Sequence, residues 1–371
     1  MSSQENSTYV GMDVHKAAIN VAVVNEGRSG FKAEWQIANE TRAVRQMIKK
    51  LTRMAPGEVK AAYEAGPCGY TIQRQMRKEG IDCVVVAPSL IPVKPGEHIK
   101  TDRRDARKLA VLLHAGMLTD VHPPTLEDEA VRDLTRSRED TKQDQMRARH
   151  RLAKMLLRHG FVFNDGKNWT KQHHRWLKQV RFGEEISQRV FDSYLLVVEQ
   201  VEERLKSIDE QLEVVAKGGR YRERVGWLRC LRGVDTVTAM TILAELHDFQ
   251  RFTNPRELMS FLGLTPSEHT SASRVRRGSV TKAGNSHVRR MLVEAAWNYR
   301  YRPSVSVYKR RLREGQPTRV LAIADRAQER LYRRYFKLRE GYRKPNNVVA
   351  VAIARELVGF IWAVLQHREA A

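Results

Sequence analysis

Four acidic residues in the first third of the sequence have the types and spacing that suit metal-assisted chemistry. Asp13 lies inside a run of strand-forming residues, and Glu64 ends a second such run. Asp102 and Asp105 are three residues apart at the start of a helical pattern, so they project from the same side of that helix. A carboxylate in a core strand is costly unless it is paired or holds a cation. Asp13 therefore has little structural reason for its position.

Carboxylates gathered in this way support phosphoryl transfer with divalent metal ions. They repel one another until a cation neutralises them, and their oxygens are hard ligands of the kind that Mg²⁺ takes, with Mn²⁺ as an alternative. Two such ions about 4 Å apart can hold the attacking and leaving oxygens of a phosphodiester. The alternatives are structural: Asp102 and Asp105 can favour a helix N-terminus electrostatically. Neighbouring arginines such as Arg103 and Arg107 can pair with them as surface ions, and Glu64 can form a salt bridge at its strand end.

A second set of candidate residues lies far downstream, in a basic loop rich in Ser, Gly and Thr. A serine such as Ser271 or Ser273, near metal ions and arginines, can attack a phosphate and form a covalent phosphoserine link. The alternative is that these serines, with Ser279, are ordinary loop residues that contact phosphate or solvent. The cationic residues of this region are expected to bind nucleic-acid phosphates rather than to read bases. They are Arg274, Arg276, Arg277, Lys282, Arg289 and Arg290.

The charge of the whole chain indicates a polyanionic partner. The 371 residues include 66 Lys and Arg against 43 Asp and Glu, which gives a formal net charge of +23. Cationic side chains gain affinity for nucleic acid by releasing its condensed counterions. The three cysteines form no CxxC pair, which argues against a disulfide scaffold or a Cys-based zinc site. The N-terminal residues show no signal peptide, so we expect an intracellular protein. The apolar stretch 348–365 is broken by Arg355 and Glu356, so we do not expect it to span a membrane.

The elements that must position these residues alternate between strands and helices over the first hundred residues. The patterns predict strands at 9–24 (two, joined by a tight link), 31–38, 59–65 and 81–88, and helices at 39–55, 66–80 and 101–116. The order is three strands, helix, strand, helix, strand, helix. It predicts an α/β domain of the RNase H-like (RuvC-like) fold, followed by mainly helical regions.

Four regions are expected along the chain. They are an α/β catalytic domain at 1–123, a helical coiled-coil region at 124–219, a mainly helical domain at 220–320 and a basic helical tail at 321–371. Within the coiled-coil region, apolar residues between 194 and 215 alternate in steps of four and three, as in a heptad seam. This seam either packs helices within the chain or associates subunits. The third region begins with a helix-hairpin-helix-like segment and contains the serine loop.

Four segments together resemble the DEDD-type transposases of insertion sequences, the IS110 group with its IS1111 branch, to which Piv-type DNA invertases are related. The segments are YVGMDVHK, AAYEAG, KTDRRDARKLA and GLTPSEHTSASRVRRGSVTKAGNSHVRR. The resemblance extends from about residue 8 to about residue 300. It implies a RuvC-like N-terminal domain in which Asp13, Glu64, Asp102 and Asp105 form a metal-binding tetrad for Mg²⁺.

The resemblance also implies a C-terminal transposase domain that carries a serine nucleophile. The family places this serine in a P-x(4)-S-G-type loop, which starts here at Pro266 and makes Ser271 the nucleophile. Ala272 stands where the family usually has Gly, and Ser273 is the alternative nucleophile. Members of the family are linked to a structured non-coding bridge RNA that pairs with donor and target DNA. The implied protein is a homo-oligomeric (dimeric or tetrameric) recombinase of the bacterial cytoplasm, associated with the nucleoid when it is bound to DNA.

Two rival functions fit the same residues. The first is a metal-dependent nuclease of the Holliday-junction type, in which water is the nucleophile and Ser271 is structural. The second is a non-enzymatic, basic nucleic-acid-binding protein whose acidic residues are vestigial. A site-specific DNA invertase would differ from a transposase only in the arrangement of its DNA substrates.

Overall fold

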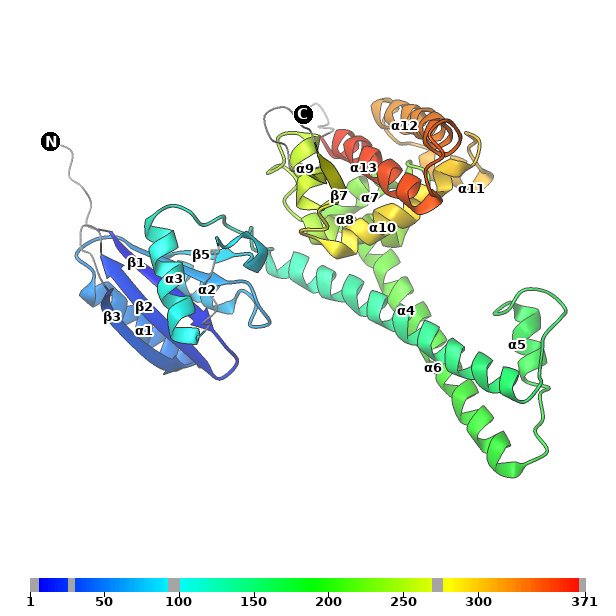
Figure 1. Cartoon of the computed structure of the whole chain (residues 1–371), viewed down its shortest axis with the longest axis horizontal. Helices are drawn as coiled ribbons and strands as arrows, with labels where there is room; N and C mark the ends of the chain where they lie inside the picture. Colours follow the sequence, from blue (N-terminus) through cyan, green and yellow to red (C-terminus); the bar gives the residue numbers. More distant parts are fainter. Residues whose placement is uncertain (1–6, 26–30, 93–100, 269–275, 367–371) are drawn as a thin grey trace. The chain divides into compact units, whose positions relative to one another are not determined.

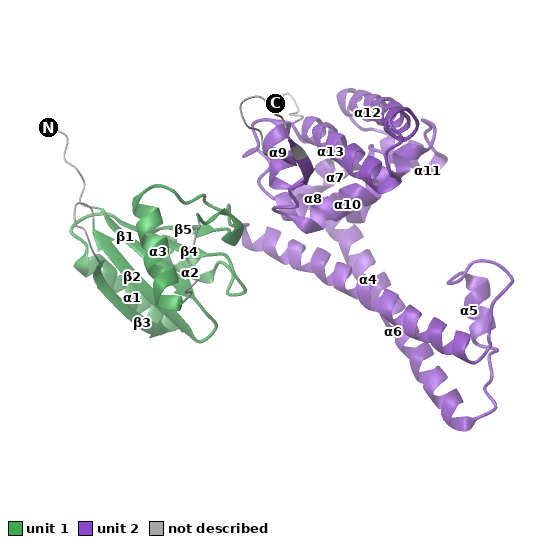
Figure 2. Ribbon diagram, in the orientation of Figure 1, with its two compact units in different colours: residues 1–123 green, residues 124–371 purple. Residues whose placement is uncertain are grey.

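The computed structural model describes most of the chain as two compact units, residues 1–123 and 124–371 (Figures 1 and 2). The described residues are 7–25, 31–92, 101–268 and 276–366. The predicted nucleophile Ser271, its alternative Ser273 and the predicted phosphate-binding Arg274 lie outside them. Each unit is described by itself below.

The first unit is built on a five-stranded mixed sheet with the strand order β3-β2-β1-β4-β5. The central strand β1 is antiparallel to β2 and parallel to β4, while β2 pairs with β3 antiparallel and β4 pairs with β5 parallel. The strands are β1 Thr8–Val14, β2 Ala18–Asn25, β3 Phe31–Ala38, β4 Val59–Glu64 and β5 Asp82–Val86. A mixed sheet of this kind, followed by a mostly helical region, fits an RNase H-like transposase domain.

Helices cover both faces of this sheet, because β1 presents alternate side chains to each. Val10 and Met12 are fully buried in a core that also contains apolar residues of helices α1 and α2. On the opposite face Gly11 lies against α3, and a Cβ at this position would collide with the backbone of Ala106 and Ala110. Figure 1 shows α3 on one side of the sheet and α1 and α2 on the other. The helices are α1 Thr41–Met54, α2 Thr71–Lys78 and α3 Asp102–His114, with a short 3-10 helix at Pro88–Leu90.

The second unit begins with a long helical arm. Helices α4 Leu126–Arg158 and α6 Glu185–Lys217 pack against each other, and the short helix α5 Lys171–Leu177 lies near the outer end (Figure 1). Of the predicted heptad seam, Leu205 and Leu212 are buried, and ion pairs such as Arg138 with Asp209 join the two helices. The heptad seam therefore packs helices within this chain, and its buried positions are not open to a second subunit.

The remaining helices surround one large apolar core. They are α7 Arg222–Arg229, α8 Thr236–Leu246, α9 Pro255–Phe261, α10 Ser286–Ala296, α11 Val307–Arg313, α12 Thr318–Phe336 and α13 Asn346–Leu365. Shorter segments complete the unit: η2 Gly219–Tyr221, the hairpin strands β6 Pro266–Glu268 and β7 Arg277–Val280, η3 Trp297–Arg300 and the π-helix Lys337–Gly341. The core contains residues of both the predicted third and fourth regions: α13 packs with α7, α9 and α10, and α12 packs with α13 and η3.

Helix α13 has the length and apolar composition of a membrane-spanning helix. Half of its apolar window is nevertheless buried inside the second unit, and residues such as Ile353 and Leu357 are fully buried in the core. Its partners are α9, α10 and α12. This agrees with the buried helix that the sequence predicts for 348–365.

The helix-hairpin-helix-like segment forms as predicted, with α7 and α8 joined by a turn at Gly233, where φ is +78°. The carbonyls of this turn are used within the unit. The Lys309 ammonium donates to the carbonyls of Arg229, Leu231 and Val234, at 2.7, 3.0 and 2.6 Å. Burial lowers the pKa of Lys309 to about 8. The Lys309 side chain thus binds the carbonyl oxygens at this turn.

Candidate active site

The ends of two parallel strands bring Asp13 and Glu64 to the same edge of the sheet. In the parallel register of β1 and β4, Met12 lies opposite Tyr63, so Asp13 and Glu64 come one residue further along each strand. Neighbouring residues at the same level of a sheet face the same side. Alternation from Gly11 places Asp13 on the face that α3 covers.

The start of α3 delivers the second pair of acids to this edge. Thr101 caps the helix, and its hydroxyl accepts a hydrogen bond from the backbone N–H of Arg104 at 3.4 Å. Asp102 and Asp105 therefore occupy the first helical turn. The close approach of α3 to Gly11 determines how near this turn lies to Asp13. The glycine provides room for the helix backbone.

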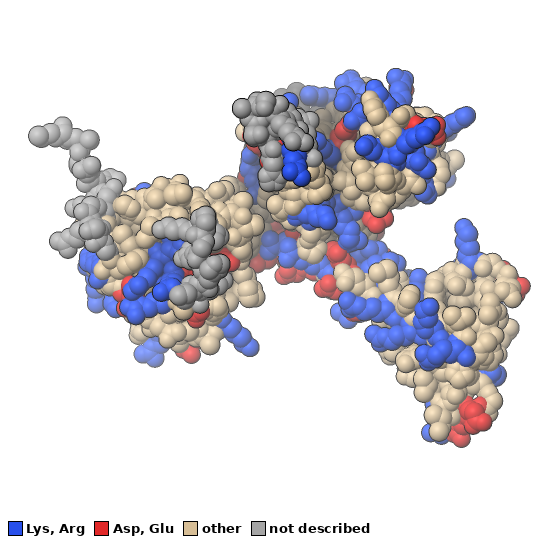
Figure 3. All heavy atoms as spheres, in the orientation of Figure 1, with Lys and Arg blue, Asp and Glu red and all other residues tan. Residues whose placement is uncertain are grey.

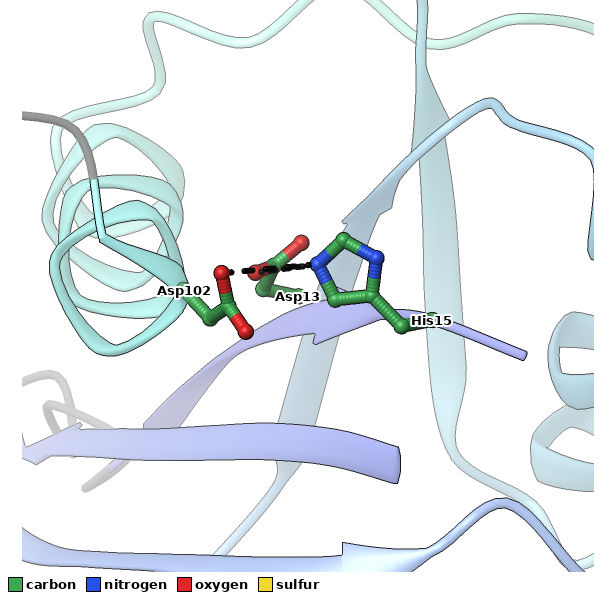
Figure 4. Close-up of side chains that lie close together, drawn as sticks. All are labelled: Asp13, His15 and Asp102. Atoms are coloured by element: carbon green, nitrogen blue, oxygen red, sulfur yellow. Dashed lines mark hydrogen bonds and ion pairs between the residues drawn. The ribbon is translucent and has the colours of Figure 1, made fainter. Parts of the chain in front are cut away.

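Three side chains converge at the sheet edge: Asp13, Asp102 and His15 (Figure 4). The His15 Nε2 atom lies 3.1 Å from Asp13 Oδ2 and 3.6 Å from Asp102 Oδ1. One potential ligand atom from each residue lies within 4.8 Å of the other two. Two carboxylates and an imidazole suit a divalent cation such as Mn²⁺, and the two carboxylates suit Mg²⁺.

The electrostatics of this site favour a bound cation. Burial raises the pKa of Asp13, the charge and hydrogen bond of His15 lower it, and the negative charges of Asp102 and Asp105 raise it again, with a net increase. Asp105 is therefore close enough to act on Asp13 through its charge, although it is not one of the three converging residues. Glu64 is half-buried and is not one of them either. The structure brings together two of the four predicted acids, and it adds His15.

The arginines beside these acids have another partner. The Arg107 guanidinium donates to both oxygens of Glu34 on β3, at 2.6 and 2.9 Å, and Arg103 also donates to Glu34. Arg107 and Arg103 together hold the pKa of Glu34 below its usual value, despite burial, with the hydrogen bonds of Arg107 making the largest contribution. The structure therefore shows Arg103 and Arg107 bound to Glu34 rather than to Asp102.

In the second unit, the predicted phosphate-binding residues have different surroundings. Arg276 and Lys282 are exposed, and Arg277 belongs to β7, which pairs with β6. Arg289 instead donates to the carbonyls of Leu262 and Ala283, at 2.9 and 3.3 Å. Its guanidinium is thus engaged in holding the loop before α10 in place.

Arg290 likewise has a partner within the unit. Its Nε donates to Glu139 on α4 at 2.9 Å, and His287 Nδ1 lies 2.8 Å from the same carboxylate. A second carboxylate, that of Glu245, accepts two hydrogen bonds from Arg136 at 2.7 and 3.0 Å and one from Asn285 at 2.6 Å. These contacts tie α10 and α8 to α4. Part of the predicted basic surface is therefore structural.

Replacing Glu245 by Gln is expected to lower the free energy of unfolding of the second unit by about 2 kcal/mol. Burial raises the pKa of Glu245, but the hydrogen bonds and charge of Arg136, with that of Asn285, outweigh it and leave the pKa below the ordinary value of about 4.5. The stabilisation is thus present above pH 4.5 and is lost as the pH falls through the lowered pKa. Denaturant unfolding at pH 7 and pH 3 measures this; an equal difference between Glu245→Gln and wild type at both pH values would contradict it.

The arrangement of the first unit defines a class of protein. A mixed sheet with carboxylates gathered at its edge, followed by a large helical unit, is the arrangement of a DEDD-type transposase. A family model of DEDD transposases of the IS110 type, described as "Transposase", matches residues 10–161, and one described as "Transposase IS116/IS110/IS902 family" matches residues 227–310.

Similar proteins agree with these matches. The putative transposase y4qE of Sinorhizobium fredii is 39% identical over 97% of this chain and 88% of its own length. The transposase for insertion sequence element IS1533 of Leptospira borgpetersenii is 37% identical over 92% of this chain and 99% of its own. The chain belongs to the IS110 family of insertion-sequence transposases, which cleave and transfer DNA strands. DEDD-type transposases generally use a divalent metal, and Asp13, His15 and Asp102 form a possible site for it.

Proposed function

We propose that this transposase cuts and rejoins DNA at the ends of a mobile element with a Mg²⁺-dependent acidic site in its first unit and a serine nucleophile in its second. The observation that carries the first part is the convergence of Asp13 and Asp102, while the neighbouring Arg103 and Arg107 bind Glu34. Divalent metal, when bound, would polarise the scissile phosphate and stabilise its developing charge. Mn²⁺ is the alternative ion.

The residues of the first unit have distinct parts in this proposal. Asp13 and Asp102 hold the cation, and Asp105 and Glu64 complete the acidic set from the helix turn and the neighbouring strand end. His15 lies between the two converging carboxylates. It either contributes its Nε2 as a further ligand or rotates away when the cation binds. The RuvC-like assignment of residues 1–123 rests on this set of residues and on the strand order.

The serine step is proposed from the sequence of the loop between β6 and β7. The hydroxyl oxygen of Ser271 attacks the phosphorus, a serine–phosphate bond forms, and the bond from phosphorus to the leaving deoxyribose oxygen breaks. The hydroxyl proton passes to a base at the site, and the leaving oxygen takes up a proton. Attack by a hydroxyl of another strand end then restores the phosphodiester and frees the serine. Exposed Arg276 and Lys282 flank this loop and would bind the phosphate backbone.

The resemblance and the net charge of +23 also support a guide RNA that pairs with donor and target DNA. In that case the protein needs only to bind the nucleic-acid backbone. An oligomer, dimer or tetramer, would hold two DNA duplexes together. These parts of the proposal, like the division of the second unit into a coiled-coil region, a transposase domain and a basic tail, rest on the sequence.

The decisive test is the chemical nature of the protein–DNA intermediate. The full-length protein is incubated in Mg²⁺ with labelled DNA of an element end, digested with protease, and the labelled peptide is identified by mass spectrometry. We expect the DNA to be attached to Ser271. Attachment to Ser273 would reassign the nucleophile. Strand cleavage that leaves no covalent adduct would overturn the serine mechanism in favour of a nuclease that uses water.

A further inference from the structure

A basic face lies on the C-terminal half of helix α4. It borders a groove of about 710 Å³ between α4 and α6. The groove is lined by Met146, Arg147, His150, Arg151, Lys154, Arg158 and Tyr194. Figure 3 shows Lys and Arg side chains gathered along the middle of the helical arm. We call the side chains of Arg147, Arg151, Lys154 and Arg158 the basic face of the arm.

The spacing of these four cations puts them on one side of the helix. They follow one another in steps of four, three and four residues, which is the spacing of a single helical face. At 1.5 Å per residue the basic face extends over about 16 Å. All four residues are exposed, whereas apolar residues between them such as Leu152 and Met155 are buried in the core that α4 forms with α6.

Three of the four cations of the basic face lack the carboxylate partners that several other cations of the arm have. Elsewhere on the arm Arg149 pairs with Glu202 at 2.6 Å, and Lys206 lies within 4.0 Å of both Glu203 and Glu210. On the basic face, Arg147 has Asp144 at 3.2 Å. Among the described parts of the chain, Arg151, Lys154 and Arg158 have no carboxylate oxygen within 4.0 Å.

Neither helix stability nor folding accounts for this arrangement. Cations in the last turn of a helix are stabilised by the helix dipole, but this effect falls off within that turn. Of the four cations, Arg158 at the end of α4 receives it most strongly. Arg151 and Arg147 lie about two and about three turns away from the end of α4 at Arg158. Like charges side by side repel each other, so an unneutralised row costs stability unless a polyanion occupies it.

We propose that the basic face of the arm binds the phosphate backbone of duplex DNA. A transposase has DNA as its substrate, and one strand of B-DNA offers a phosphate every 3.4 Å along the axis, or about five over the length of the face. Two rings line the groove: Tyr194, which is half-buried among apolar side chains, and His150, which is exposed. Four exposed cations beside a single exposed ring favour contacts with phosphates over stacking of unpaired bases. Backbone contact of this kind is independent of sequence, and it would hold DNA flanking the cleaved site.

The test compares two full-length variants that each lose three positive charges from the same arm. The first replaces unpartnered cations of the basic face, R151Q, K154Q and R158Q. The matched control replaces exposed cations that have carboxylate partners, K178Q, R189Q and K206Q. Binding to a 40-base-pair duplex DNA of arbitrary sequence is measured in EDTA at several salt concentrations. Because no metal and no strand cleavage are involved, the result is independent of the proposed catalytic mechanism.

The salt dependence is the informative quantity. Each phosphate contact contributes roughly 0.9 to the slope of log affinity against log salt. We expect the first variant to show a slope smaller by about 2 to 3 and an affinity at least about tenfold weaker at 0.1 M salt. The control should keep nearly the wild-type slope. Equal losses in both variants, or none in the first, would overturn the proposal, as would a loss confined to duplex RNA of the same length.

Discussion

Replacing Asp13 by Asn is expected to reduce DNA strand cleavage in Mg²⁺ by roughly a thousandfold or more. Stabilisation of a phosphoryl transition state by metal is worth several kcal/mol, and each 1.4 kcal/mol is a factor of ten in rate. Asp13 is one of the two carboxylates that converge, and it is the more buried of the two, with 16% of its side chain exposed against 60% for Asp102. Cleavage of labelled element-end DNA, measured in single-turnover conditions, gives the rate.

The fold should survive this change, which makes the loss of rate interpretable. Burial and the neighbouring acids raise the pKa of Asp13, so the neutral amide removes a charge that the metal-free protein holds at a cost. We expect Asp13→Asn to unfold at the wild-type temperature or slightly above it. Wild type should gain stability on addition of Mn²⁺, because a ligand that binds only the folded state stabilises it, and the variant should lose this gain.

Asp82→Asn is the matched control for Asp13→Asn. Asp82 begins β5, at the opposite edge of the same sheet, and its carboxylate is half exposed, near Arg77 at 3.8 Å. Its replacement changes charge by the same amount without touching the converging acids. Cleavage should remain within about twofold of wild type. An Asp13→Asn protein that cleaves DNA as fast as the Asp82→Asn protein would remove the acidic site from the mechanism.

The sequence patterns predict the strands and helices of the first unit and the two carboxylates that converge, those of Asp13 and Asp102. Strict alternation around Asp13 and the capped start of α3 are local patterns, and the mixed sheet and the helices of the first unit follow from them. The sequence does not single out His15, although it shares the strand face of Asp13, because it lies in the link beyond β1 and one histidine has no metal-ligand spacing by itself. Glu64 is predicted because it ends a strand, and the parallel register brings it level with Asp13. Convergence of the side chains, however, depends on rotamers that no sequence pattern encodes.

Long-range pairing explains the other differences. Glu34 on β3 accepts hydrogen bonds from Arg103 and Arg107 on α3, which are far from it in the sequence. In the same way, Arg290 is bound by Glu139, which lies on a helix of the distant arm. A basic stretch read along the chain does not reveal which of its cations are already paired. Such pairing is decided by tertiary packing.

The second large effect is expected from a residue that takes no part in chemistry. Gly11→Ala places a Cβ against the carbonyl oxygen of Ala106 and the amide nitrogen of Ala110, which are helix backbone and cannot rotate away. Helix α3 must therefore move off β1, at a cost of about 1–3 kcal/mol in the stability of the first unit. Because Asp102 is in the first turn of α3, the same movement separates it from Asp13. A misplacement of about 1 Å can cost 100-fold in rate, and we expect a loss of that order in DNA cleavage.

Two comparisons separate this positioning effect from simple unfolding. Rates are measured well below the unfolding temperature of the variant, where it is fully folded, and Mn²⁺ binding is measured at the same temperature. Gly183→Ala is the control, since a Cβ there meets nothing within 4 Å and Gly183 has no positive φ. Affinity for Mn²⁺ should fall together with the cleavage rate in Gly11→Ala and stay unchanged in Gly183→Ala. If Gly11→Ala lost stability but kept both its Mn²⁺ affinity and its cleavage rate, the approach of α3 to β1 would serve the fold alone, and Asp102 would not need its place beside Asp13.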